Sequence, residues 1–126
     1  MKKLSLYVFL VLMFCGNVLA ESKDRNIRLN QLFEQLKKSN NTSLAFEIEM
    51  KIWNIWSTHP THDNFTQSLA KGSSLMSRGE LEVAYKIFST IIELAPEWAE
   101  GWNKRATVLY LMGRYQDSLK DINEVL

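Results

Sequence analysis

The sequence predicts an all-α protein, a right-handed helical-repeat solenoid of antiparallel helix pairs, and three observations lead to that prediction. The chain matches itself at an offset of about 34 residues, which is one of the periods found in helical-repeat proteins. Apolar residues recur at three- and four-residue steps, as they do along one face of a helix. Both prolines, Pro60 and Pro96, stand just after the second helix of a predicted pair.

The first 20 residues have the organisation of a secretory signal. Lys2 and Lys3 supply positive charge, and Leu4 to Phe14 is apolar except for one serine. Val18-Leu19-Ala20 then provides the small residues that signal peptidase accepts. We therefore predict a signal peptide over residues 1–20, cleavage after Ala20, and a secreted or periplasmic mature protein.

An uncleaved membrane anchor is the alternative interpretation of this segment. A transmembrane helix needs about 20 apolar residues, and Leu4 to Ala20 comes close to that length. The protein would then be a membrane-anchored assembly factor with the same repeats facing the periplasm. Cys15 follows the bulky Phe14, which does not resemble a lipidation signal. After cleavage the chain has no cysteine, so neither disulfides nor thiolate chemistry are predicted.

Length and charge restrict the function further. A chain of 126 residues is long enough for one domain and too short for two. The formal net charge is +1, and it becomes −1 once Lys2 and Lys3 leave with the signal. A surface for nucleic acid is therefore not predicted.

Residues 63–126 contain the clearest repetition, as two units over 65–98 and 99–126, the second of them incomplete. Each unit has the apolar spacing of two amphipathic helices joined by a glycine turn. The pairs matched by the offset include Gly72 with Ala106, Gly79 with Gly113, Leu75 with Leu109, Ala84 with Ser118, and Phe88 with Ile122.

The chain before these repeats, residues 21–62, is predicted to form a divergent helical pair. Its apolar residues have helical spacing over Ile27–Leu36 and over Leu44–Trp56, with a polar turn between them. A terminal unit of a repeat array is often atypical. Asp63 or Asn64 is then expected to cap the first helix of the repeats.

These positions resemble the tetratricopeptide repeat (TPR) family, whose pattern is sparse but positional. Ser68 stands where the family usually has a tryptophan, and Ser118 replaces an alanine. Both substitutes are small, which preserves close packing where two helices approach. The resemblance assigns structural positions to Gly72, Gly79, Ala84, Phe88 and Pro96 in one repeat, and to Trp102, Ala106, Gly113, Tyr115 and Leu119 in the next.

The resemblance also implies a function, that of a non-catalytic scaffold that binds another protein without a cofactor. In the family, the first helix of each pair lines a concave groove suited to a peptide or a partner helix. A clamp for a C-terminal carboxylate would be incomplete here, with only Asn103, Lys104 and Lys71 nearby. The residues at groove-facing positions are Ser73, Met76, Ser77, Asn103, Thr107, Tyr110 and Leu111.

A small metal-dependent hydrolase is the rival from a different class. His59, His62 and Asp63 are the only cluster of potential metal ligands, but they lie in a short turn around a proline. A catalytic zinc needs three rigidly held ligands, so solvated loop histidines and no metal are the preferred interpretation. The sequence contains no P-loop, no G-x-S-x-G and no H-E-x-x-H motif.

Two further expectations concern exposure. Trp98, at the junction between two helical pairs, is expected to be partly exposed. The last predicted helix carries Leu119, Ile122, Val125 and Leu126, and no capping helix follows them. Repeat arrays normally end in a unit with a polar outer face. We therefore expect either a fragment of a longer repeat protein or self-association through the C-terminal helix.

Overall fold

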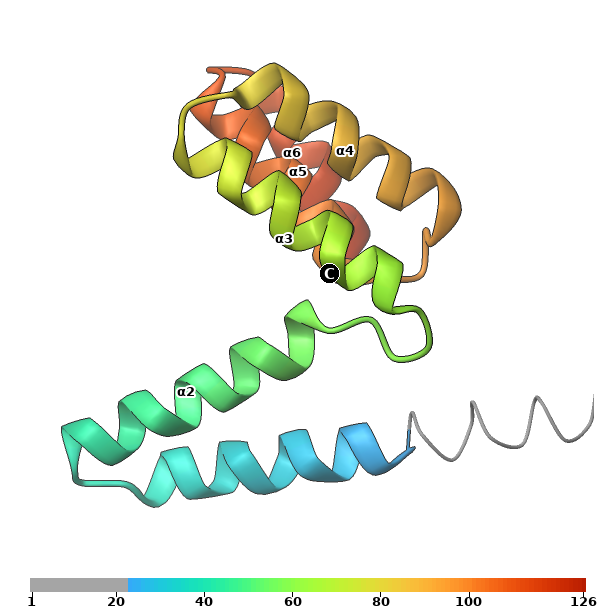
Figure 1. Cartoon of the computed structure of the whole chain (residues 1–126). Coiled ribbons are helices and arrows are strands. Elements are labelled where there is room, and N and C mark those ends of the chain that lie inside the picture. Colours follow the sequence, from blue (N-terminus) through green and yellow to red (C-terminus); the bar gives the residue numbers. More distant parts are fainter. Residues whose placement is uncertain (1–22) are drawn as a thin grey trace, which may run out of the picture. The chain divides into compact units, whose positions relative to one another are not determined.

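The computed structural model describes residues 23–126, which form α-helices joined by turns, with no strand in that range (Figure 1). The all-α prediction is therefore confirmed. Contacts divide the chain into two compact units, Met1–Trp56 and Ser57–Leu126. The predicted signal peptide and its cleavage site lie outside the described residues.

The N-terminal unit contains a helical segment over residues 23–38 and helix α2, Thr42–Ser57. Asn41 caps the start of α2, because its side-chain Oδ1 accepts hydrogen bonds from the backbone N–H groups of Ser43 at 2.9 Å and Leu44 at 3.2 Å. Ile48 and Ile52, one turn apart, are the buried residues of α2. The described residues before the second unit are thus mostly helical.

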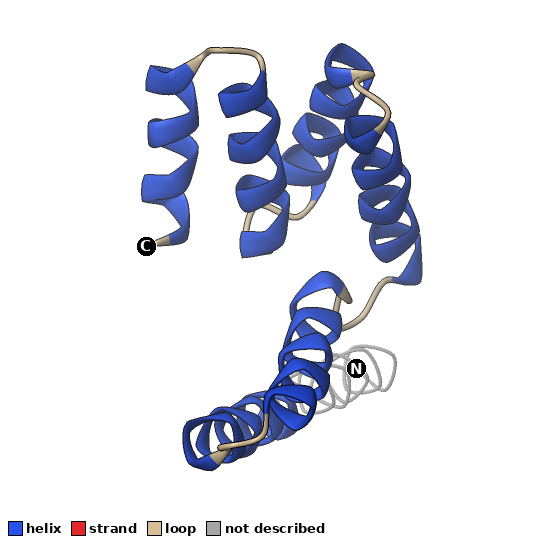
Figure 2. Ribbon diagram, turned by 90° about the vertical axis from the view of Figure 1, so that its left-hand side faces the viewer, coloured by secondary structure: helices blue, strands red, loops and turns tan. Residues whose placement is uncertain are grey.

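The second unit contains four helices: α3 (Asp63–Ser77), α4 (Leu81–Leu94), α5 (Ala99–Leu111) and α6 (Tyr115–Val125). Each helix contacts the next one along the chain, and α3 also contacts α5. Figure 2 shows these helices side by side, joined by short turns. The second unit is therefore a continuous series of packed helices.

Glycine ends the first helix of each pair. Gly79 and Gly113 have φ of 80° and 75°, the left-handed region that is costly for other residues. At the first turn, the N–H of Gly79 donates to the carbonyl of Met76 at 3.0 Å, and the N–H of Glu80 donates to Leu75 at 2.9 Å. These bonds satisfy carbonyls that the helix end would leave unpaired, and they reverse the chain.

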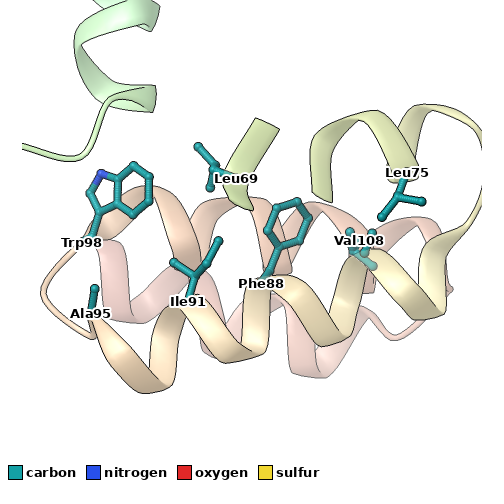
Figure 3. Close-up of a cluster of buried hydrophobic side chains, with 8 residues drawn as sticks. Leu69, Leu75, Phe88, Ile91, Ala95, Trp98 and Val108 are labelled. Carbon is teal, nitrogen blue, oxygen red and sulfur yellow. The ribbon is translucent and has the colours of Figure 1, made fainter. Parts of the chain in front are cut away.

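The core of this unit lies between α3, α4 and α5. Phe88 is fully buried and faces Gly72, where an added Cβ would be 2.6 Å from the nearest ring carbon. That distance explains why the crossing of α3 and α4 requires a glycine. The cluster drawn in Figure 3 also contains Leu69, Leu75, Ile91, Ala95, Trp98 and Val108.

The sequence expectations about Trp98 and about the N-cap of α3 are wrong. Trp98 is only 6% exposed, because it packs into the core cluster with its ring 5.0 Å from that of His59. The N-cap of α3 is His62, and its side chain makes no capping hydrogen bond. Asp63 is instead the first residue of α3, where a negative charge interacts favourably with the helix dipole.

An ion pair joins α5 and α6. Arg105 donates from Nε and Nη2 to the two carboxylate oxygens of Asp121, at 2.7 and 2.8 Å, and from Nη1 to Ser89 Oγ on α4 at 3.2 Å. The hydrogen bonds to Asp121 raise the pKa of Arg105, against the opposing effect of burial. Nearby, the hydroxyl of Ser118 donates to the carbonyl of Ala106 at 2.7 Å. These contacts hold α6 against the preceding helices.

Candidate functional site

The candidate binding surface is the set of positions on the two first helices, α3 and α5, that the sequence analysis predicts to face a groove, and we call it the first-helix surface. Its members are the seven residues predicted from the sequence: Ser73, Met76, Ser77, Asn103, Thr107, Tyr110 and Leu111. Because α3 and α5 contact each other, the surface belongs to one compact unit.

The α3 part of the first-helix surface is small and mostly polar. Ser73 and Met76 are half-buried, whereas Ser77 is exposed. The Ser77 hydroxyl donates to the Ser74 carbonyl at 2.8 Å, which leaves its oxygen available as an acceptor. The α3 part therefore consists of two serines and one half-buried methionine.

The α5 part carries larger groups. Tyr110 is 62% exposed and Leu111 is also exposed, so the end of α5 presents an aromatic ring beside an aliphatic side chain. The Tyr110 ring lies 5.2 Å from that of Tyr115 at the start of α6. Exposed aromatic residues of this kind are typical anchors of protein interfaces.

Polar side chains precede Tyr110 along α5. Thr107 is exposed, and its hydroxyl donates to the Asn103 carbonyl at 3.0 Å. Asn103 is half-buried and donates from Nδ2 to Glu100 Oε2 at 3.2 Å. Asn103 is therefore held in place by its own helix before any partner arrives.

Glu100 is a residue that the sequence analysis missed. It is 6% exposed, and Lys104 Nζ lies 3.5 Å from its Oε1, which accepts no hydrogen bond from the described residues. A buried carboxylate is costly unless it is paired. The one available signal was its spacing, three residues before Asn103 and four before Lys104, which places all three on one helix face.

The histidines of the rival metal hypothesis lie in the turn before α3. His59 is 5% exposed rather than solvated, and its Nδ1 accepts the backbone N–H groups of Thr61 at 3.3 Å and His62 at 3.1 Å. Its Nε2 lies 3.9 Å from a Glu97 oxygen. Within the described residues, no three His, Cys, Asp or Glu side chains are grouped so that they could hold a metal. His59 organises the turn that leads into α3.

The outer face of α6 exposes apolar side chains. Tyr115 and Leu119 of α6 and Leu126 directly after it are exposed, although residues at the matching positions one repeat earlier are half-buried or buried. The difference arises because α5 covers α4, with Gly101 against Ile91 and Ile92. No helix of the described chain covers this face of α6 in the same way.

Among residues 23–126, none of the helices combines the length and the apolar character that crossing a bilayer requires.

Helix pairs, glycine turns and small residues at the crossings define an all-α helical-repeat protein of TPR-like fold.

Comparison with known proteins supports that class. The chain is 32% identical over 115 residues to a TPR repeat-containing protein of Rhizobium etli, an alignment that covers 87% of this chain and 55% of that protein. It is also 33% identical over 48 residues to an uncharacterized protein of Methanocaldococcus jannaschii, covering 38% of this chain and 56% of the other. The chain thus spans about half the length of the curated relatives it matches.

No family model matches the chain, and no solved structure matches it.

Proposed function

We propose that this protein is a non-catalytic scaffold that binds another protein through the first-helix surface. The observation that carries the proposal is the exposure of Tyr110 and Leu111 beside pre-positioned polar groups on α5. An apolar anchor with adjacent hydrogen-bonding groups suits a peptide or an amphipathic helix of a partner. Similarity to a TPR repeat-containing protein supports the same class of function.

Photo-crosslinking in the organism that encodes the protein tests this proposal. A photoreactive amino acid at Thr107, which is exposed on the same helix, should give a discrete crosslinked species. Leu111→Ser should weaken that species. Val83→Ser is the matched control, because Val83 is also exposed and aliphatic but lies on α4. Equal crosslinking in both variants would show that the partner does not use the first-helix surface.

We also propose that the protein acts outside the cytoplasm, in the periplasm or as a secreted protein. The proposal is supported by the basic start, the apolar segment and the small-residue end of residues 1–20. Mass spectrometry of the mature protein should find Glu21 at its N-terminus, and Ala20→Phe should leave the precursor uncleaved. An intact N-terminus in the unmodified protein would instead favour the membrane-anchored assembly factor.

Self-association through α6 is a second proposed interaction, supported by the exposed Tyr115, Leu119 and Leu126. Gel filtration of the purified protein should show a dimer or a larger species, and Leu119→Lys should shift it to monomer. Lys120→Leu is the opposite change, because it adds an apolar residue on the same helix, and it should leave the protein associated. A cooperatively folding monomer that binds no hydrophobic dye would refute this proposal.

A further inference from the structure

A cavity of about 210 Å³ lies between α3 and α4, within the unit Ser57–Leu126. Its walls are mainly apolar and are formed by Phe65, Ile87, Ile91 and Leu94. Its polar groups are the uncharged side chains of Asn64, Ser68 and Thr90. The cavity is separate from the first-helix surface, because it shares no residue with it.

The internal repeat explains why this cavity exists. The offset of about 34 residues places Ser68 of α3 on Trp102 of α5. In α5 the indole is present, and its Nε1–H donates to the carbonyl of Pro96 at 2.8 Å. In α3 the same position carries only the hydroxymethyl group of Ser68, which lines the cavity beside α4. The second repeat therefore shows which kind of group fits this position of the helix pair.

We propose that the cavity beside Ser68 is a binding site for a tryptophan side chain of a partner polypeptide. Its volume suits one ring system, because an engineered apolar cavity of about 150 Å³ binds benzene, whereas drug-sized pockets begin at about 300 Å³. Leu94, at its edge, is 65% exposed and offers apolar area to the peptide that carries the ring.

The uncharged lining distinguishes a peptide side chain from a free metabolite. A free amino acid would bring an ammonium and a carboxylate group, and the cavity has no charged residue to pair with either. A tryptophan within a chain brings only neutral amides, and its indole N–H can donate to the Asn64 or Ser68 oxygen. Polypeptide-borne tryptophan is thus the ligand that this chemistry recognises.

A titration of the ¹⁵N-labelled protein tests the proposal, with N-acetyl-tryptophanamide as the probe. We expect saturable shifts of the backbone amides of Ser68, Ile91 and Leu94, with a dissociation constant in the millimolar range. Free tryptophan should bind at least about tenfold more weakly, a difference of about 1.4 kcal/mol. Shifts confined to other residues, an absence of saturation, or tighter binding of free tryptophan would overturn the proposal.

Variants locate the site independently of the probe's affinity. Ser68→Trp should fill the cavity from within, abolish the shifts and raise the midpoint of urea unfolding. Lys71→Trp is the matched control, because Lys71 is exposed on the same helix and is not part of the cavity. Leu94→Asp, at an exposed position, should weaken binding without unfolding the protein. Undiminished binding by both Ser68→Trp and Leu94→Asp would refute the site while leaving the first-helix surface untouched.

Discussion

Replacement of Gly72 by alanine tests the packing of the repeat most directly. A Cβ atom at this position would lie 2.6 Å from Phe88 Cε1 and 2.8 Å from Cζ. Carbon atoms in good contact are about 3.5–4.0 Å apart, so the ring or the helix has to move. Phe88 is fully buried on the neighbouring helix, and its ring has little room to give way.

Two opposing effects set the magnitude. Overpacking of this kind costs about 1–3 kcal/mol, whereas glycine to alanine in a helix interior stabilises by about 1 kcal/mol. Gly72→Ala should therefore lower the free energy of unfolding by up to about 2 kcal/mol. In the second repeat the matching residues are Ala106 and Ile122, so an alanine there corresponds to a smaller side chain than Phe88.

A double-mutant cycle with Phe88→Ile isolates the clash. Urea unfolding of the four proteins, followed by the circular dichroism of the helices, gives the free energy of each. In the Phe88→Ile background, Gly72→Ala should become neutral or stabilising, with an interaction energy of about 1–3 kcal/mol. The cycle subtracts the cavity that Phe88→Ile itself creates. An equal effect of Gly72→Ala in both backgrounds would refute the proposed contact.

Three further substitutions test other parts of the fold by the same unfolding measurement. Ala84→Leu, at a fully buried position of α4, should lower the free energy of unfolding by about 1–3 kcal/mol. Lys86→Ala, on the exposed side of the same helix, should leave that free energy almost unchanged. Equal effects of the two substitutions would argue against the assigned helix face. His59→Phe keeps a ring but removes the acceptor of two backbone N–H groups, so it should cost about 1–3 kcal/mol, while His62→Phe at an exposed position serves as control. Gly113→Ala should cost about 1–2 kcal/mol through its positive φ alone, since nothing lies within 4 Å of the added Cβ; an unchanged midpoint would contradict that strain.

The sequence by itself determined the helical architecture, because the signals for it are local. Three- and four-residue spacing of apolar groups specifies a helix face wherever it occurs. Gly79 and Gly113 specify the turns, since only glycine adopts a left-handed conformation without strain. The spacing and the glycine turns need only neighbouring residues, and the repeat needs only a comparison of the chain with itself. The structural position of Gly72 came from the resemblance to the TPR family.

Only the tertiary structure decided which side chains are buried. Trp98 was expected to be partly exposed and His59 solvated, yet their rings pack 5.0 Å apart inside the second unit. Glu100 is buried although its position near the start of a helix suggests exposure. Trp98 and His59 are distant from each other in the sequence, so no local pattern encodes their contact.

The cavity beside Ser68 depends on both kinds of information. The sequence showed that Ser68 replaces a tryptophan of the repeat pattern, which on its own indicates only a smaller side chain. Whether the lost volume closes or persists depends on how α4 packs against α3, and here Ile87 and Ile91 remain at the wall of an open cavity. The physical reason is that packing density is a property of several helices together, so it is decided only when they assemble.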